Sequence, residues 1–581
     1  MQTINLKING LAVTAQKGDT ILQAAQRNGI KIPTLCYLKE LNEIGACRVC
    51  VVEVKGARSL VASCVYPAEE GMEVVTNSKR VLLSRKKTVE LIFSEHEKKC
   101  LSCSRSQKCE LQALSVELGC EEGKYEGAVN TYPLDLTTPY LVRDNNKCVL
   151  CRRCVAACKS YQGVAVIGAN ARGFDTHVGT SFNKDLKDVP CVGCGQCITV
   201  CPTGALRERE EIDDVITALN DPTKYVVMAT APAVRVAIGE EFGFPIGTNQ
   251  EGKMVAAMKM LGAKKIFDID FSADLTILEE GTEFINRVKN NGVLPMFTSC
   301  SPAWIKFVEH YYPEFIPNLS SCKSPQQMFG AVIKTWYAEK NGIDPKNIVM
   351  VSVMPCVAKK FEKTRDFQSA AGVPDIDHVI TTRELARLIT RQGILFSDLT
   401  DAEFDNPLGE DTGAGVIFGV TGGVMEAALR TVREVLENKD YGNDRINFTE
   451  VRGLDGIKEA TYDIAGIEVK VAVASGLANA RALLDAIKAG KVFYHFVEIM
   501  SCPGGCINGG GQPIKTAHIR NNVNFRDLRA KALYDADEAM TLRKSHQNPV
   551  VKQLYAEYFG SPNSHKAHDV LHTKYAPRPK F

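Results

Sequence analysis

The sequence predicts a modular α+β protein in which small cysteine-rich domains precede one large α/β domain with parallel sheets and helices. Two observations support this division. The chain has 581 residues and 21 cysteines, and 16 of the cysteines lie before residue 202. After about residue 210, apolar strand-like runs alternate with helical stretches, which is typical of helices packed on a largely parallel sheet. We expect four domains, at residues 1–80, 81–125, 126–209 and 210–581.

The first domain begins with an alternating run, residues 4–15, that contains the pair Asn9–Gly10. This pair is typical of a tight hairpin. Thr20 then precedes an expected short helix that ends near Gly29. Four cysteines follow, separated by ten, two and thirteen residues: Cys36, Cys47, Cys50 and Cys64. Their spacing suits a 2Fe–2S cluster on a ferredoxin-like β-grasp fold, with zinc as the alternative. The long first gap resembles the N-terminal unit of the large iron–sulfur subunit of respiratory complex I.

The second domain is helical and charged, and it ends in a set of metal-ligand residues: His96, Cys100, Cys103 and Cys109. One histidine with three cysteines is a common ligand set for structural zinc. Because cluster-like cysteine sets flank this one, we expect a 4Fe–4S cluster with one histidine ligand instead. A neutral imidazole in place of an anionic thiolate would raise the reduction potential of that cluster.

The third domain contains an internal repeat of four cysteines at short spacings. The first copy holds Cys148, Cys151, Cys154 and Cys158, and the second holds Cys191, Cys194, Cys197 and Cys201. In two-cluster ferredoxins the fourth cysteine of each run binds the other cluster. We therefore assign Cys201 to the first three cysteines of the first copy and Cys158 to the first three of the second. Two zinc sites are the alternative, but zinc sites seldom use such a spacing twice.

In the last domain, most cysteines stand at the ends of predicted elements beside proline or glycine: Cys300, Cys356, Cys502 and Cys506. Working sites of open α/β sheets lie beyond the carboxyl ends of the strands. We therefore expect these cysteines to converge on one site. Cys120 and Cys322 fall outside every set, and we expect them to be small buried apolar side chains.

Three stretches of this last domain resemble the FeFe hydrogenases, and the resemblance covers essentially the whole chain. They are TSCSPAW (298–304), MPCVAKKFE (354–362) and EIMSCPGGCINGGGQP (498–513). The resemblance implies an H-cluster, which is a 4Fe–4S cubane bridged to a two-iron subsite with CO, cyanide and a dithiolate. It implies Cys300, Cys356, Cys502 and Cys506 as the cubane ligands, with Cys506 as the bridge. A phosphate-binding loop at the glycines of the third stretch is disfavoured, because no strand–GxGxxG–helix context surrounds them.

The pair Cys300–Ser301 departs from many members of the family, which have two adjacent cysteines in this loop. One of them is a cluster ligand and the other donates protons to the two-iron subsite. Because a hydroxyl is a poor ligand for iron–sulfur clusters, we assign Cys300 as the ligand and Ser301, or a water, as the proton relay. In the opposite assignment Cys300 is the relay and the cubane has an unusual ligand.

The resemblance also implies residues around the H-cluster and a proton route. Lys359 should donate a charge-assisted hydrogen bond to a cyanide ligand. Further residues should line the pocket: Ala231, Pro232, Gln326, Met354 and Met500. Glu280 and Glu283 are three residues apart on one predicted helix face, and Ser320 should lie between them. A carboxylate, a hydroxyl and a second carboxylate can pass protons along hydrogen bonds.

The predicted function is a FeFe hydrogenase, an oxidoreductase that reversibly reduces protons to hydrogen gas. The predicted cofactors are the H-cluster, one 2Fe–2S cluster and three accessory 4Fe–4S clusters. Three alternatives are a hydrogen sensor, a pure electron-transfer subunit and a cluster-assembly relative. A sensor would carry a signalling domain, the electron-transfer subunit would lack the three stretches, and the assembly relative would lack the proton relay.

The expected partners are ferredoxin or another redox protein, maturation proteins for the two-iron subsite, and additional subunits if the chain belongs to a multimeric NAD(P)-linked bifurcating hydrogenase. With 70 Lys and Arg against 68 Asp and Glu, the charge balance gives no reason to expect nucleic acid. No apolar run is long enough for a membrane span. The first residues lack an apolar signal core, so we expect a cytoplasmic protein.

Overall fold

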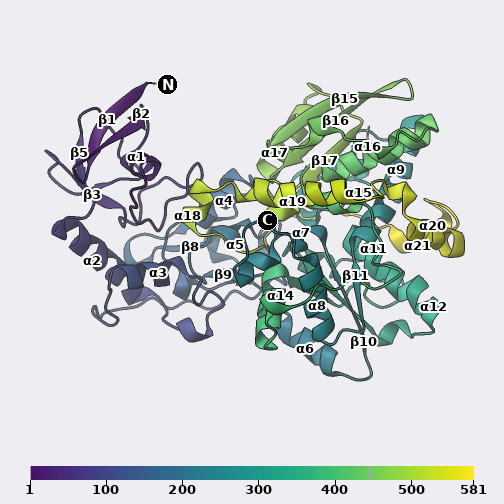
Figure 1. The fold of residues 1–581 in the computed structure, drawn as a ribbon, viewed down its shortest axis with the longest axis horizontal. Helices are drawn as coiled ribbons and strands as arrows, with labels where there is room; N and C mark the ends of the chain where they lie inside the picture. The colour runs from purple at the N-terminus through teal and green to yellow at the C-terminus, as the bar shows by residue number, and fades with distance from the viewer. Residues whose placement is uncertain (1, 444–445, 581) are drawn as a thin grey trace.

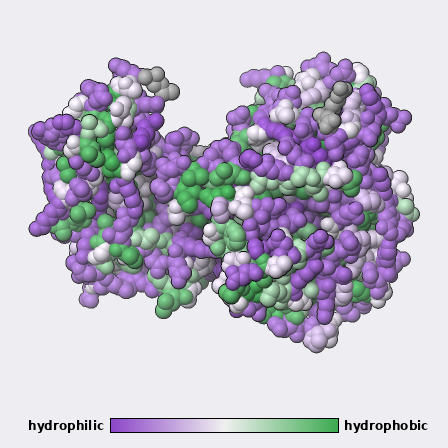
Figure 2. All heavy atoms as spheres, viewed as in Figure 1, coloured by the Kyte–Doolittle hydropathy of each residue, from purple (hydrophilic) through white to green (hydrophobic). Residues whose placement is uncertain are grey.

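The computed structural model describes residues 2–443 and 446–580. The cysteine-rich N-terminal part forms an arm beside a larger α/β body, and helix α19 (Phe525–Ala539) crosses the viewed face of that body (Figure 1). Figure 2 shows that this face is mainly hydrophilic, with a hollow between the arm and the body. Within the described residues, no helix is long and apolar enough to cross a membrane.

The arm begins with a five-stranded sheet in the order β2-β1-β5-β3-β4. The predicted hairpin is confirmed: β1 (Thr3–Ile8) pairs antiparallel with β2 (Leu11–Gln16) across a turn in which Asn9 and Gly10 have positive φ. The predicted short helix is α1 (Ile21–Arg27), which starts with a capping box between Thr20 and Gln23. The remaining strands of the sheet are short: β3 (Val51–Val54), β4 (Val61–Ala62) and β5 (Glu73–Val75).

Helices and two small two-stranded sheets form the rest of the arm. A long helix, α2 (Lys79–Glu95), leads to the second cysteine set, and α3 (Glu110–Glu117) follows it. The two copies of the four-cysteine repeat each contain one helix, α4 (Arg153–Ser160) and α5 (Gln196–Val200). In one small sheet, β6 (Leu141–Arg143) pairs antiparallel with β9 (Leu206–Glu208), and in the other β7 (Ile167–Asn170) pairs antiparallel with β8 (His177–Thr180).

The body contains two four-stranded sheets, and the predicted α/β organisation with parallel sheets is confirmed. The first sheet, in the order β11-β10-β13-β14, is entirely parallel. The second, in the order β12-β17-β16-β15, is parallel except for the β15–β16 pair. The strands of the first sheet are β10 (Tyr225–Thr230), β11 (Lys265–Asp268), β13 (Ile348–Met354) and β14 (His378–Thr381). Those of the second are β12 (Met296–Phe297), β15 (Ile457–Ile464), β16 (Ile467–Ser475) and β17 (Phe496–Met500).

Helices cover both sheets and bury their apolar faces. The predicted helical stretches are confirmed as α8 (Glu251–Met260), α16 (Gly423–Glu437) and α17 (Leu477–Lys488). The largest apolar core surrounds the first sheet, where Val227, Met228 and Ile266 are fully buried. Parallel strands that are buried on both faces consist of continuous apolar runs, which explains why these strands could be predicted from the sequence. Helix α9 (Asp270–Lys289) directly follows β11 and packs against α16 and α11 (Pro325–Val332).

Candidate active site

The candidate active site is a cavity at the point where the ends of three strands meet. Cys300 comes three residues after β12, Cys356 two residues after β13, and Cys502 two residues after β17. Cys506 follows in the same loop as Cys502, and all four cysteines line the one cavity. Strands β12 and β17 are parallel neighbours in the second sheet and β13 belongs to the first, so the carboxyl ends of strands from both sheets border this cavity.

The chemistry of these thiols fits a metal cluster. Every cysteine of the chain is free of disulfide bonds. Burial raises the pKa of Cys506 to about 12 and also raises the pKa of Cys300, Cys356 and Cys502. The nearby Lys359 lowers the pKa of Cys300, Cys356 and Cys506 without offsetting their burial, so thiolates here need further positive charge, and iron supplies such a charge. The donor set therefore fits an iron–sulfur group held by thiolates.

Lys359 lies in the cavity wall and is held by three hydrogen bonds. Its Nζ donates to the carbonyl of Cys300 at 3.1 Å, to Ser324 Oγ at 2.8 Å and to Glu362 Oε2 at 2.9 Å. The same Glu362 oxygen accepts from Gln326 Nε2 at 3.1 Å. Glu362 therefore fixes the position of both pocket residues. Glu362 is the last residue of the stretch MPCVAKKFE, but no pattern in the sequence predicted this role for it.

The other residues predicted to line the pocket also border this cavity: Ala231, Pro232, Gln326, Met354 and Met500. Pro232 is the first residue of a short helix, α7 (Pro232–Arg235), at the end of β10. Met354 and Met500 end β13 and β17, and each is 3% exposed. Strand ends therefore position most of this wall.

Cys300 and Ser301 both line the cavity, but they face different neighbours. Burial and then the carboxyl of Glu280 raise the pKa of Cys300. Ser301 Oγ lies 2.8 Å from Ser501 Oγ, on the loop that carries Cys502. Ser501 was not predicted from the sequence, although it directly precedes the predicted ligand Cys502.

Glu280, on α9, is 1% exposed, and neither of its carboxyl oxygens has a hydrogen-bond partner within the described residues. Burial, reinforced by the nearby Glu283, raises the pKa of Glu280 to about 8. The carboxyl is therefore mainly protonated at neutral pH. A buried carboxyl that titrates near neutral pH can both accept and donate a proton.

Glu283 lies one turn further along α9 and is partly exposed. Its Oε2 accepts a hydrogen bond from Ser320 Oγ at 3.0 Å, and its Oε1 accepts one from Arg287 at 2.6 Å. Ser320 is thus bonded to Glu283, whereas Glu280 has no partner within hydrogen-bond distance. Arg287 was not predicted from the sequence, although its spacing of four residues from Glu283 on one helix was a usable signal.

The two cysteine repeats surround two separate cavities in the arm. One is lined by Cys148, Cys151 and Cys154 together with Cys201, and the other by Cys191, Cys194 and Cys197 together with Cys158. Each cavity thus brings together three cysteines of one copy and the fourth of the other.

The second of these cavities shares a wall with the candidate active site, because Cys194 lines both. The two loops approach at backbone distance. A Cβ atom at Gly510 would lie 2.6 Å from the carbonyl oxygen of Cys194 and 2.8 Å from the Cα of Gly195. Glycine at 510 therefore permits the glycine-rich loop to contact the cysteine loop directly.

The first cysteine set lies in the N-terminal sheet domain and contacts the repeat through polar bridges. Cys50 Sγ and Cys64 Sγ are 3.3 Å apart, and the amide of Cys47 lies 3.5 Å from Cys36 Sγ. The buried side chain of Asn42 donates to the carbonyl of Cys36 at 2.7 Å and to that of Cys151 at 3.0 Å. One amide group thus joins two cysteine sets, a contact that no sequence pattern indicated.

The histidine-containing set lies between α2 and α3. Burial lowers the pKa of His96 to about 4, and its buried Nδ1 has no hydrogen-bond partner within the described chain. A neutral imidazole with an unpaired nitrogen fits a metal ligand. Cys103 lies next to the repeat, since a Cβ atom at Gly204 would be 2.7 Å from its Sγ. Cys100 and Cys109 begin a short 3₁₀ turn and cap α3, respectively.

Comparison with protein-family models gave five matches. The model of the iron only hydrogenase large subunit, C-terminal domain, matches residues 224–510, and that of the iron hydrogenase small subunit matches residues 523–578. A 2Fe-2S iron-sulfur cluster binding domain matches residues 1–79. The iron-sulfur binding region of NADH-ubiquinone oxidoreductase-G matches residues 85–124, and a 4Fe-4S dicluster domain matches residues 138–205.

Two curated relatives match over their full lengths. The chain is 46% identical to the NADP-reducing hydrogenase subunit HndD of Solidesulfovibrio fructosivorans, with 100% of both chains covered. It is 44% identical to iron hydrogenase 1 of Clostridium pasteurianum, with 98% of this chain and 99% of the relative covered. Among solved structures, that of the FeFe hydrogenase HydA(deltaEFG) is 43% identical and has a TM-score of 0.56, with 64% of this chain and 99% of that chain covered.

Proposed function

This chain belongs to the iron-only hydrogenase family, and from that premise we propose how its residues divide the work of the enzyme. The reaction is the reversible reduction of protons to hydrogen gas. One observation carries the proposal: buried cysteines from three strand-end loops line a cavity, and Cys194 of the adjoining cysteine site lines the same cavity. The active site thus has metal-binding thiols and direct contact with an electron-transfer site.

We assign Cys356, Cys502 and Cys506 to the cubane of the H-cluster, with Cys506 as the bridge to the two-iron subsite. When bound, the H-cluster supplies the hydrogen chemistry, and the accessory clusters supply electron transfer. The chain supplies the thiolates and a largely apolar wall. It also supplies Lys359, a cation that Glu362 and Ser324 orient beside the cavity and that suits an anionic cyanide ligand.

For the pair Cys300–Ser301, the neighbours favour the second of the two assignments weighed from the sequence. After burial, the neighbouring carboxyl of Glu280 is the next largest cause of the raised pKa of Cys300. Ser301 instead contacts the loop that carries Cys502. We therefore propose that the Cys300 thiol exchanges protons with Glu280 and that the Ser301 oxygen takes the fourth position facing the cubane.

The proton route continues along one face of α9. Glu280 is buried and holds its proton near neutral pH, and Ser320 donates to Glu283, which is partly exposed and paired with Arg287. We propose the order Cys300, Glu280, Ser320, Glu283. Two links, Cys300 to Glu280 and Glu280 to Ser320, have no hydrogen bond within the described residues, and rotation of the Glu280 carboxyl would have to close both.

We propose that the arm holds four accessory clusters: one 2Fe–2S cluster, a 4Fe–4S cluster with His96 as a ligand, and two 4Fe–4S clusters with the crossed cysteine assignment. The contacts support an order of sites. Asn42 joins the first set to the Cys151 set, and Cys194 joins the second repeat to the active site. The proposed domain boundaries are those of the sequence analysis: 1–80, 81–125, 126–209 and 210–581.

We further propose that the chain works with other subunits, since it matches the full length of a relative that is itself a subunit of a NADP-reducing hydrogenase. Thiols that form no disulfide bonds suit a reducing compartment, which supports the cytoplasm. The two-iron subsite requires maturation proteins. Purification from the native cell tests the subunit proposal. Co-elution of a nicotinamide-binding chain is expected, and activity of the isolated chain with ferredoxin alone would contradict it.

Infrared spectroscopy of the matured protein, prepared without oxygen, tests the functional proposal. Carbonyl and cyanide stretches are expected, together with hydrogen production from a strong reductant. A protein without these bands would contradict the H-cluster assignment. Bands with negligible turnover would instead favour the hydrogen-sensor alternative.

A further inference from the structure

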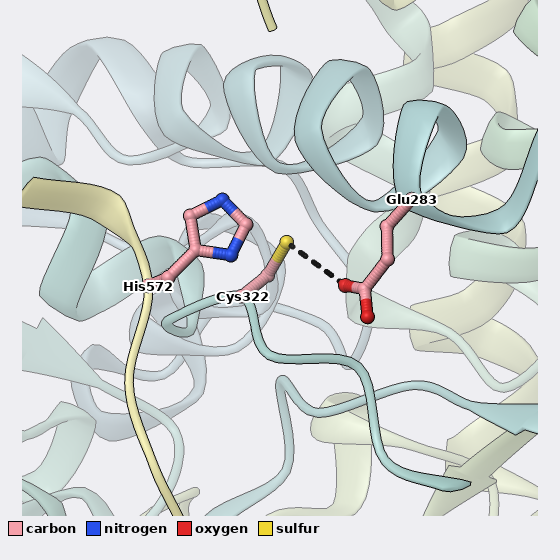
Figure 3. A group of neighbouring side chains, drawn as sticks. All are labelled: Glu283, Cys322 and His572. Carbon is pink, nitrogen blue, oxygen red and sulfur yellow. Dashed lines mark hydrogen bonds between the residues drawn. The ribbon is translucent and has the colours of Figure 1, made fainter. Parts of the chain in front are cut away.

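A second group of metal-ligand side chains lies outside the thiol-lined cavity. Glu283, Cys322 and His572 each offer one ligand atom, and these atoms lie within 4.8 Å of one another. Figure 3 shows that they come from three different segments: helix α9, the loop before α11, and the chain just after α21 (His565–Leu571). Cys322 is fully buried and His572 is 8% exposed. Cys322 is buried, as predicted from the sequence, but its neighbours Glu283 and His572 were not predicted.

The backbone holds two of the three residues side by side. Cys322 and His572 form an isolated antiparallel β-bridge. The hydrogen bonds on either side of the bridge run from Lys323 N to Leu571 O and from Thr573 N to Ser321 O, both at 2.8 Å. Regular backbone pairing therefore holds the residues that carry the thiol and the imidazole directly opposite each other.

The imidazole of His572 is oriented as in many metal sites. Its Nε2 lies 3.1 Å from Glu279 Oε2, and its Nδ1 lies 2.8 Å from Ser321 Oγ. Metal-binding histidines commonly donate their second ring N–H to a carboxylate, which fixes the tautomer and raises ligand basicity. Glu279 can play this part here and leave the Nδ1 lone pair directed towards Glu283 and Cys322. The Ser321 hydroxyl can turn from Nδ1 to Glu283 Oε2, which lies 3.3 Å from it.

The two oxygens of Glu283 face different partners. Oε1 pairs with Arg287, whereas Oε2 faces the Cys322 thiol at 3.9 Å and accepts from serine groups. One oxygen is therefore available as a ligand while the other keeps its ion pair. A cysteine thiolate and a glutamate carboxylate would balance the charge of a divalent ion, and the imidazole would stay neutral.

We infer that Glu283, Cys322 and His572 form a binding site for a borderline-soft divalent cation such as Zn²⁺. Thiolate and imidazole ligands favour Zn²⁺ over Mg²⁺ and Ca²⁺, which prefer sites made of oxygen atoms. Three protein ligands leave a fourth tetrahedral position for water. The ligand atoms need to move together by about 1 Å to reach zinc bond lengths, and rotation of Glu283 and Cys322 about their side-chain bonds supplies such a movement.

Occupancy of this site would inhibit the enzyme. A cation bound to Glu283 Oε2 removes the atom that accepts the Ser320 hydrogen bond, so Glu283 can no longer accept a proton from Ser320. This consequence rests on the proposed proton route, whereas the binding of the ion does not. The cation site is thus a point at which metal availability would control turnover.

Zinc K-edge X-ray absorption of the cluster-loaded enzyme tests the site, because iron does not contribute at this edge. Untagged protein would be incubated with Zn²⁺ and freed of loosely bound metal by gel filtration. We expect one retained zinc per chain, with one sulfur at about 2.3 Å and nitrogen or oxygen ligands at about 2.0 Å. Iron per chain should stay constant, which shows that zinc has not replaced cluster iron.

Two variants and a matched control make the test specific. Cys322→Ala should lose the sulfur scatterer and the retained zinc, and His572→Gln should weaken retention at least tenfold. Cys120→Ala removes the other unassigned cysteine, whose thiol contacts the Lys86 carbonyl in the arm, and should behave as the wild type. If both site variants retained zinc with an unchanged sulfur shell, the inference would be wrong.

Hydrogen production measured in the same samples separates the site from the proton route. We expect Zn²⁺ to inhibit the wild type and Cys120→Ala, and at least tenfold more Zn²⁺ to be needed for Cys322→Ala. Zinc bound through Cys322 without any loss of turnover would support the metal site and contradict the place of Glu283 in the proposed proton route.

Discussion

At the scale of single residues, Cys300 and Ser301 make the sharpest prediction. If Cys300 exchanges protons with Glu280, Cys300→Ala should keep the carbonyl and cyanide bands but reduce hydrogen production by about 10²- to 10⁴-fold, the usual contribution of a positioned proton donor. Ser301→Ala should instead weaken the cubane, which can be measured as iron content and as the electron paramagnetic resonance signal of the H-cluster.

The reverse pattern would restore the first assignment made from the sequence. In that case Cys300→Ala would lose the H-cluster signals, and Ser301→Ala would keep them with slower turnover. Ser301→Cys serves as the control for the loop. It restores a pair of adjacent cysteines and should keep both the bands and the activity.

Glu280 predicts a pH dependence. Burial, followed by the charge of Glu283, raises its pKa to about 8, so the carboxyl is protonated at pH 7 and loses its proton as the pH rises through about 8. We expect an infrared titration to show a carboxylic acid C=O stretch that disappears near pH 8 and is absent in Glu280→Gln. Hydrogen production should fall over the same range. A carboxylate already ionised at pH 6 would contradict this prediction.

The raised pKa of Glu280 also determines how the stability of the folded protein changes with pH. The folded protein binds this proton more tightly than the unfolded chain, whose carboxyl titrates near 4.5. The contribution of Glu280 to stability is therefore complete below about pH 4.5 and is lost as the pH rises towards 8. Glu280→Gln should remove this decline, which denaturant unfolding at several pH values can measure.

The residues predicted from sequence were those with a short local pattern. Cysteine spacings and the three hydrogenase-like stretches indicated the thiols that line the cavities. Partners from distant segments had no such signal. The Asn42 side chain donates hydrogen bonds to the backbone carbonyls of Cys36 and Cys151. His572 contacts Glu279, which lies 293 residues earlier in the sequence. Such contacts depend on the packing of whole domains, which spacing along the chain does not encode.

At the scale of elements, the glycine-rich loop makes a prediction. A Cβ atom at Gly510 would lie 2.6 Å from the carbonyl oxygen of Cys194. Gly510→Ala should therefore push the two loops apart, at a cost of about 1–3 kcal/mol for overpacking. Reduction of the H-cluster by electrons entering through the arm should slow, which stopped-flow infrared spectroscopy can measure.

A matched glycine variant provides the control for this loop. Gly168 lies in β7 of the arm, and a Cβ atom there would meet nothing within 4 Å. Gly168→Ala should leave both stability and the reduction rate unchanged within error. Equal rates for Gly510→Ala and the wild type would show that contact between the loops does not govern electron delivery.

The strands and helices of the body were predictable because each has a strong local period. Continuous apolar runs predicted the strands β10, β13 and β16, and amphipathic patterns predicted the helices α16 and α17. Sheet order was not predictable in this way. Strand β12 has only two residues, Met296 and Phe297. It nevertheless pairs with β17, which lies 200 residues later in the sequence, and this pairing positions the loop of Cys300.

At the scale of the whole molecule, the arm and the body meet at the cavity wall that contains Cys194. The sequence indicated cluster-binding units and a catalytic domain but could not show that a repeat cysteine borders the active site. That contact depends on the tertiary approach of backbones near residues 195 and 510. It supports the proposed path from the arm to the active site.

The central claim is that three distant loops hold one iron centre, two of them through the thiolates of Cys356, Cys502 and Cys506, with Cys506 as the bridge. Infrared spectroscopy and hydrogen production of Cys506→Ala, matured in parallel with the wild type, test it most directly. We predict that the carbonyl and cyanide bands and hydrogen production are lost while the signals of the accessory clusters remain. Hydrogen production at the wild-type rate in this variant would contradict the claim.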